Sequence, residues 1–133
     1  MTEHTVESFL GATVELEKGK QIRVLHVDDE PDLLKITDQC LKMQGQFLVD
    51  GVRSVEEAFE RLQTTKYDVI VSDYQMPRKD GLKFLKELRK GGNKIPFIMF
   101  TGKGNEEVAI EALNMGASQY LNKAGDPETV YGQ

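Results

Sequence analysis

The amino-acid sequence predicts an α/β fold in which a doubly wound, five-stranded parallel sheet carries helices on both faces. Short runs rich in β-branched residues alternate with amphipathic helical patterns, with a period of about 20 to 28 residues. The runs show little alternation of apolar and polar residues, as expected for strands covered on both faces. The segments between them are long enough for crossover helices, so successive units predict right-handed βαβ connections.

Length and composition limit the classes of protein to consider. The 133 residues suffice for one domain with a continuous core but not for a second full domain beside it. The net charge of −5 and the scattered basic residues argue against direct nucleic-acid binding. The single cysteine, Cys40, excludes an intrachain disulfide, and neither a membrane-spanning run nor a signal-peptide pattern is present. We therefore expect a cytoplasmic protein that contacts neither nucleic acid nor a membrane.

The first twenty residues differ in character from the rest of the chain. Residues 1–20 are polar and acidic, and their apolar residues recur at loosely helical spacing. We expect a leader here, either a short helix or a flexible extension, without chemistry of its own. The main domain is expected to begin at Gln21 and to comprise residues 21–133.

The first predicted strand, residues 21–27, is followed by the acidic pair Asp28 and Asp29. Pro31 stands where the first turn of a helix tolerates proline, and apolar positions on one helical face continue until Gly45.

The second and third predicted strands are residues 47–52 and 67–72. Between them, Ser54 and Glu57 have the spacing of a capping box at the start of a helix. The third strand ends on Asp73, ahead of a proline-containing loop.

A third helix is predicted to begin at Asp80. The fourth strand, residues 95–100, ends on Thr101, and a further helix precedes the brief fifth strand, residues 118–121, which leads to Lys123.

Each predicted strand that carries a reactive side chain carries it at its carboxyl end. These side chains are Asp28 and Asp29 after the first strand, Asp73 after the third, Thr101 after the fourth and Lys123 after the fifth. In a parallel sheet these ends lie on one edge, where ligands bind in open α/β folds. Taken alone, each residue is common in turns and helix caps, so their joint placement carries the prediction.

Three carboxylates in one place repel one another unless a cation is bound. Oxygen ligands without histidine or cysteine favour a hard ion, and a site that leaves room for water and phosphate suits Mg²⁺. We expect Asp29 and Asp73 to be direct ligands, Asp28 to act directly or through water, and the backbone carbonyl of Gln75 to complete the set.

A lysine and a hydroxyl are expected beside this metal site. Lys123 would offer a positive charge to a phosphoryl oxygen, and the Thr101 hydroxyl would offer a hydrogen bond. A metal, a lysine and a hydroxyl around one carboxylate predict in-line phosphoryl transfer to Asp73.

The motifs Val27-Asp28-Asp29-Glu30, Ser72-Asp73-Tyr74-Gln75-Met76-Pro77 with Asp80-Gly81, Phe100-Thr101-Gly102 and Tyr120-Leu121-Asn122-Lys123 resemble those of the receiver domain of two-component response regulators. The resemblance covers about residues 21–126. It implies a flavodoxin-like (βα)5 fold with strand order 2-1-3-4-5, which is a property of the family and not a result of the residue patterns. It also implies that a sensor histidine kinase phosphorylates Asp73 and that output passes to a downstream protein or a fused output module.

The resemblance also assigns roles to individual residues. Asp28 and Asp29 match the metal pair, Thr101 the switch hydroxyl, Tyr120 the switch aromatic residue and Lys123 the phosphate-binding lysine. A phosphate on the acceptor would draw the threonine inward and let the tyrosine fill the vacated space.

Two residues of the neighbouring loops, Gln75 and Lys103, flank the acceptor in the sequence motifs. We hypothesise that their long side chains tune the access of water and hence the lifetime of the phosphate.

The sequence departs from the family pattern in two places. Ala124 follows Lys123 where the family has a proline with a cis bond, which leaves open whether this bond is cis or trans. Residues 126–133 can start a last helix but cannot complete it. We expect the apolar strip under this truncated helix to be covered by the leader, by a second copy of the chain in a homodimer, or by a neighbouring segment absent here.

The sequence leaves three alternatives to a phosphoacceptor domain. A Mg²⁺-dependent phosphohydrolase with an aspartyl-phosphate intermediate is the main alternative, but such enzymes place an Asp-x-Asp motif after the first strand. A nucleotide-binding or flavodoxin-type module lacks its phosphate-binding loop here. A receiver-like scaffold without phosphorylation is disfavoured because the acid set is intact.

Overall fold

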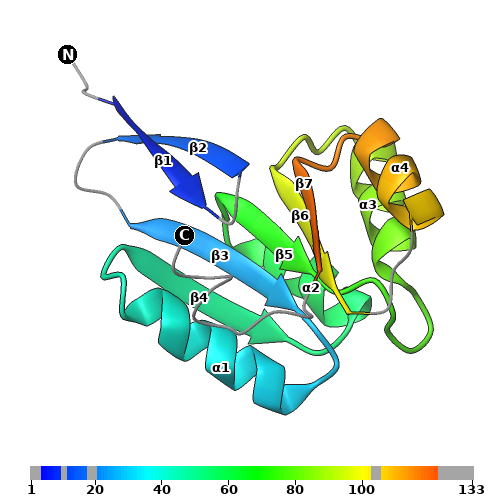
Figure 1. The fold of residues 1–133 in the computed structure, drawn as a ribbon, viewed down its shortest axis with the longest axis horizontal. Helices are drawn as coiled ribbons and strands as arrows, with labels where there is room; N and C mark the ends of the chain where they lie inside the picture. Colours follow the sequence, from blue (N-terminus) through cyan, green and yellow to red (C-terminus); the bar gives the residue numbers. More distant parts are fainter. Residues whose placement is uncertain (1–3, 10–11, 18–20, 103–105, 123–133) are drawn as a thin grey trace.

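The computed structural model describes residues 4–9, 12–17, 21–102 and 106–122 (Figure 1). A five-stranded sheet forms its centre, and four helices flank the sheet. The strands of this sheet are β3 (Ile22–Val27), β4 (Phe47–Val52), β5 (Val69–Ser72), β6 (Phe97–Thr101) and β7 (Gln119–Asn122). The helices are α1 (Pro31–Lys42), α2 (Val55–Thr64), α3 (Gly81–Lys90) and α4 (Glu106–Asn114).

The five strands are all parallel, in the order β4-β3-β5-β6-β7. Numbered along the sheet's own strands, this is the order 2-1-3-4-5 that the family resemblance implied. The winding reverses between β3 and β5, which are hydrogen-bonded neighbours. The α/β class and the strand order are therefore confirmed, and the carboxyl ends of β3 and β5 lie side by side.

Two strands begin later than their apolar runs predict, and hydrogen bonds to side chains at their starts explain the delay. Before β5, the side chain of Asp68 accepts the Arg23 N–H at 2.8 Å, in place of a backbone carbonyl. Before β6, the Ile95 N–H donates to the Asn93 side chain at 3.0 Å, and Pro96 has no N–H to give to the ladder.

Three helices begin as the capping signals predict. Pro31 is the first residue of α1, where a missing N–H costs nothing. The Ser54 side chain accepts the Glu57 N–H at 3.2 Å and caps α2. The Asp80 side chain accepts the Lys83 N–H at 2.8 Å and caps α3. The third cap places the start of α3 directly behind the loop that follows β5.

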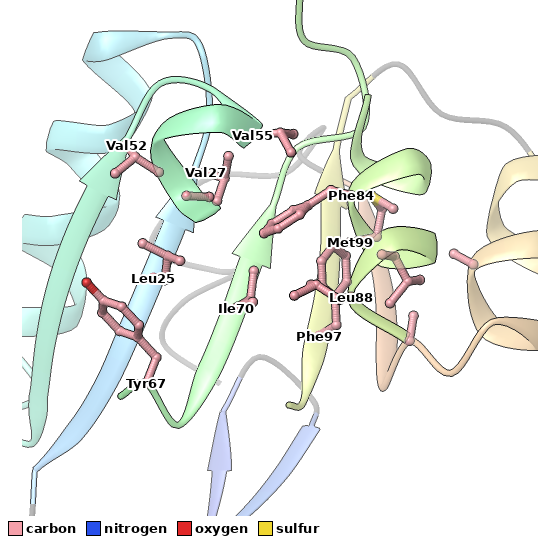
Figure 2. Packing of buried hydrophobic residues seen from close by; sticks show 14 residues of the cluster. Leu25, Val27, Val52, Val55, Tyr67, Ile70, Phe84, Leu88, Phe97 and Met99 are labelled. Atoms are coloured by element: carbon pink, nitrogen blue, oxygen red, sulfur yellow. The ribbon is translucent and has the colours of Figure 1, made fainter. Parts of the chain in front are cut away.

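The sheet has an apolar core on each face, because alternate strand residues point to opposite sides. On one face, strand residues such as Val24 and Val71 pack with Leu41 of α1. On the other face, the strands pack against α2 and α3, and Figure 2 shows Phe84 of α3 lying over Phe97 of β6. The two rings meet edge to face with centroids 5.6 Å apart. Thus β3, β5 and β6 are buried from both sides, which makes their carboxyl ends a rigid platform.

The first segment of the chain does not form the short helix that was one of the two expectations for it. The structure has an antiparallel pair there, β1 (His4–Phe9) and β2 (Ala12–Glu17), which forms a separate two-stranded sheet (Figure 1). Residues Thr13 to Glu17 alternate polar and apolar side chains, which is the period of a strand and the signal that the helical reading overlooked. Whether the main domain is best delimited as residues 21–133 stays a prediction.

Several expectations fall on residues that the structure does not describe. Lys103, Lys123 and Ala124 lie outside the described residues, as does the incomplete last helix expected at residues 126–133. Among the helices that the structure describes, none is long and apolar enough to cross a membrane.

Candidate functional site

The three predicted acids come together at the carboxyl edge of the sheet. Asp28 and Asp29 follow β3, Asp73 follows β5, and carboxylate oxygens of the three lie within 4.8 Å of one another. Backbone hydrogen bonds continue past the strands to hold them there: the Asp28 N–H donates to Val52 O at 3.0 Å and the Asp73 N–H donates to Val27 O at 2.9 Å. The strand pairing that closes the sheet therefore also gathers the acids.

The two acids closest to the strands are almost fully buried. Asp28 is 0% exposed and Asp73 is 6% exposed, whereas Asp29 is half-buried. Their carboxylates are oriented by the next turn of the chain, since the Glu30 N–H donates to Asp28 Oδ1 at 2.9 Å and the Tyr74 N–H donates to Asp73 Oδ1 at 2.7 Å. Such local bonds hold a carboxylate in one rotamer without neutralising its charge.

A glycine behind the acceptor candidate lets the loop and α3 approach closely. The Gly81 N–H donates to Tyr74 O at 2.7 Å. A side chain at position 81 would collide with the backbone carbonyl of Asp73 and would stand 2.8 Å from the sulfur of Met99. Sequence reasoning placed Gly81 at the helix start but missed this contact, which depends on how α3 docks against β5 and β6.

A cleft of about 620 Å³ opens over the acids. It is lined by residues of the loops after β3, β5 and β6, namely Asp29, Glu30, Asp73, Tyr74, Gln75, Met76, Pro77, Asp80, Thr101 and Gly102. The predicted residues Asp29, Asp73 and Thr101 thus share one solvent-facing cavity, which a small donor molecule can enter.

A slightly larger cleft, of about 700 Å³, lies at the opposite edge of the sheet. Its lining comes from the end of α2 and the segments that precede β5 and β6, and includes Lys66, Asp68 and Asn93. None of the three clustered acids reaches it, so chemistry and not size assigns the functional site to the smaller cleft.

Thr101 and Tyr120 lie on neighbouring strands near the acids. Thr101 ends β6 and is 1% exposed. Tyr120 of β7 pairs with Met99, two residues before Thr101, so both side chains point to the same face of the sheet. Burial raises the pKa of Tyr120 above 10.0, and the nearby charges of Tyr74 and Asp73 raise it further. The tyrosine is therefore close enough to Asp73 to respond to a change in charge there.

The donor set fits a hard divalent cation. It consists of carboxylates alone, and two unit charges about 4 to 5 Å apart repel by about 3 to 4 kcal/mol at an effective dielectric constant of about 20. Oxygen ligands of this kind, two of them on buried side chains, suit Mg²⁺. Gln75 borders the same cleft, and within the described residues no backbone N–H donates to its carbonyl.

A family model of the response regulator receiver domain matches residues 24–132 of the chain. The chain belongs to this family. Receiver domains are signalling domains and generally not enzymes, they receive phosphate from histidine kinases, and they generally bind Mg²⁺ at an acidic pocket.

Curated relatives agree with this assignment. The receiver domain is 35% identical over 104 residues to the response regulator RppA of Synechocystis sp., a match that covers 77% of this chain and 44% of the relative. It is 32% identical over 108 residues to the alkaline phosphatase synthesis transcriptional regulatory protein PhoP of Bacillus subtilis, covering 81% of this chain and 45% of that protein. The chain spans about half the length of the curated relatives that it matches.

Solved structures resemble the receiver domain over most of its length. The chemotaxis response regulator CheY4 of Vibrio cholerae matches with a TM-score of 0.74 and 29% identity, over 84% of this chain and 93% of that one. The receiver domain of the Francisella response regulator 1452 matches with a TM-score of 0.74 and 29% identity, over 82% of this chain and 89% of that one.

Proposed function

We propose that this receiver domain accepts a phosphoryl group on Asp73. The observation that carries the proposal is the convergence of three carboxylates within 4.8 Å at the mouth of an open cleft. Asp28 is fully buried and does not line that cleft, so a donor cannot reach it. Asp73 does line the cleft, and β5 that carries it lies between β3 with the acidic pair and β6 with Thr101. A phosphoryl group on Asp73 would therefore lie between the acidic pair on one side and Thr101 on the other.

In this proposal Asp28, Asp29, Asp73 and the backbone carbonyl of Gln75 hold Mg²⁺. The bound ion would neutralise the negative charge that builds up on the transferring phosphoryl group. The protein residues supply the geometry, because the backbone bonds at the ends of β3 and β5 hold the acids before the ion arrives.

Thr101 and Lys123 complete the proposed site. The Thr101 hydroxyl, buried at the end of β6, would donate a hydrogen bond to a phosphoryl oxygen. Lys123 directly follows β7, whose last residue Asn122 pairs with Thr101, and would offer a positive charge to another oxygen.

The proposed switch connects Thr101 to Tyr120. Tyr120 lies on the strand next to Thr101, opposite Met99 and on the same face of the sheet. If the threonine moves toward a phosphoryl group on Asp73, the tyrosine side chain can enter the space that the threonine leaves. The electrostatic sensitivity of the Tyr120 pKa to Asp73 supports a coupling between the two positions.

We propose a sensor histidine kinase as the phosphate source and a downstream protein or a fused output module as the receiver of the signal. The chain covers about half of its curated relatives, so the remainder of such a protein would carry the output. A homodimer formed with a second copy of the chain stays an alternative form of output.

The test is phosphorylation by acetyl phosphate with Mg²⁺, followed by mass spectrometry of the intact protein. The wild type is expected to gain one phosphoryl group, and Asp73→Asn is expected to gain none. Asp38→Asn is the matched control, because it removes a carboxylate from α1 that pairs with Lys42 on the surface at 3.1 Å. Modification that persists in Asp73→Asn would refute the proposal, as would the turnover of many equivalents of an added phosphate ester.

A further inference from the structure

A positive side chain stands beside the acid cluster in a position that neither the sequence motifs nor the family assignment explains. Arg53 directly follows β4, whose last residue Val52 pairs with Val27 of β3. The Asp28 N–H donates to Val52 O at 3.0 Å, so the two chain segments are joined where they leave the sheet. Arg53 therefore leaves the sheet next to the acidic pair.

The Arg53 guanidinium reaches across to that pair. Its Nη2 donates to the backbone carbonyl of Asp29 at 3.4 Å. A bond of this length is weak, and the side chain is exposed, so the contact contributes little to the stability of the fold. What it does is place a unit positive charge against the backbone of Asp29, one of the three clustered acids.

This charge remains available to an outside anion. Within the part of the chain that the structure describes, no carboxylate forms an ion pair with Arg53. Asp29, whose carbonyl it contacts, also lines the cleft that leads to Asp73. A positive charge in this position attracts phosphate anions that approach the cleft.

We infer that Arg53 is a specificity-determining residue of the phosphorylation site: it draws anionic phosphodonors, such as acyl phosphates, toward Asp73 and weakens the binding of Mg²⁺ to the three acids. The inference rests on the proposed function. The two effects have one cause, because a positive charge near the cluster attracts the donor and repels the metal. Both effects depend on ionic strength, since the exposed guanidinium acts through solvent.

The test uses two variants of Arg53 and one control. Arg53→Gln removes the charge but keeps donor groups, and Arg53→Lys keeps the charge. Arg61→Gln removes an exposed arginine from the last turn of α2, where its ion pair is with Asp50 at 4.0 Å and not with the acid cluster.

Two quantities are measured at 10 mM and at 500 mM salt: the Mg²⁺ dissociation constant by isothermal titration calorimetry, and the initial rate of labelling by acetyl phosphate at saturating Mg²⁺. At low salt, Arg53→Gln is expected to bind Mg²⁺ more tightly and to be labelled more slowly, each on the order of 2- to 5-fold. Arg53→Lys and Arg61→Gln are expected to stay within about 2-fold of the wild type, and the differences are expected to shrink at high salt.

A merely structural role for Arg53 would not change the two quantities in opposite directions. Unchanged or weaker Mg²⁺ binding in Arg53→Gln would overturn the inference, and so would a slower labelling rate that is the same at both salt concentrations. If wild type is not labelled on Asp73 at all, the proposed function fails. If wild type is labelled but Arg53→Gln matches it in both measurements, only the inference about Arg53 fails.

Discussion

Gly81 and Asp73 lie so close together that the first residue of α3 must lack a side chain. A Cβ at position 81 would overlap the backbone carbonyl of Asp73 and would stand 2.8 Å from the sulfur of Met99. The helix α3 is therefore anchored directly behind Asp73.

Gly81→Ala is expected to destabilise the domain by about 1 to 3 kcal/mol, because the added methyl group has backbone on one side and a buried sulfur on the other. Urea unfolding checks this prediction. Gly91→Ala is the control: it lies at the end of α3 with φ −79°, and its nearest neighbour would be 3.5 Å away, which is ordinary contact. Equal stabilities of the two variants would contradict the close approach of Gly81 to Asp73.

Asp28→Asn is expected to remove most of the stabilisation that Mg²⁺ confers. At an Mg²⁺ concentration ten times the dissociation constant, wild type gains about 1.4 kcal/mol of unfolding free energy. The variant is expected to be at least as stable as wild type in EDTA, because one of three mutually repelling charges is gone. Thermal unfolding with EDTA and with Mg²⁺ measures both effects, with Asp38→Asn as the control. A full Mg²⁺ gain in Asp28→Asn would argue against its place in the metal site.

Tyr120 is expected to titrate above 10.0, because burial raises its pKa first and the charges of Tyr74 and Asp73 add to this. The pKa is higher in the folded than in the unfolded chain, so the unfolded chain loses its proton first. The contribution of Tyr120 to the free energy of unfolding is therefore complete below about pH 10. It is lost as the pH rises through the pKa that Tyr120 has in the folded chain. NMR of ring-labelled tyrosines can follow the titration.

Asp73→Asn tests directly whether the charge of Asp73 influences the pKa of Tyr120. It is expected to lower the pKa of Tyr120, because it removes one of the charges that raise it. Tyr67 is the internal control: its pKa is raised by burial and then by its hydrogen bond to Asp50, at 2.6 Å, neither of which involves Asp73. A Tyr120 pKa that does not respond would weaken the proposed coupling between acceptor and switch residue.

Shortening the side chains of Gln75 and Lys103 together is expected to speed dephosphorylation several-fold, because water would then reach the phosphoryl group more easily. Gln75 is exposed and borders the cleft, which supports this expectation, whereas Lys103 lies outside the described residues. The loss of phosphate from the purified phosphoprotein gives the rate. Gln63→Ala, at the opposite cleft, is the control. An unchanged rate in the double variant would show that these side chains do not control water access.

The helices and strands of the main sheet could be predicted because their signals are local. The caps at Ser54 and Asp80 bind backbone N–H groups three residues away, which spacing alone reveals. The later starts of β5 and β6 could not be read from apolar runs, since they depend on how Asp68 and Asn93 use their side chains.

The candidate site was predictable in its residue types but not in its dimensions. The placement of Asp28, Asp29 and Asp73 at strand ends follows from the chain, and their distance of less than 4.8 Å requires β3 and β5 to be neighbours. Arg53 shows the same limit. Its position after β4 was visible, but its reach to the Asp29 carbonyl depends on the pairing of Val52 with Val27.

By itself, the sequence determined the alternation of strands and helices, the acids at the strand ends and, through its motifs, the family. Only the tertiary structure decided that residues 4–9 pair with residues 12–17, that the arginine after β4 contacts the backbone of Asp29, and that position 81 behind Asp73 has no room for a side chain. The physical reason is the distance along the chain over which each interaction acts. Periodicity and capping act within a few residues, whereas strand neighbours, register and close approach are set by packing between segments that are distant along the chain.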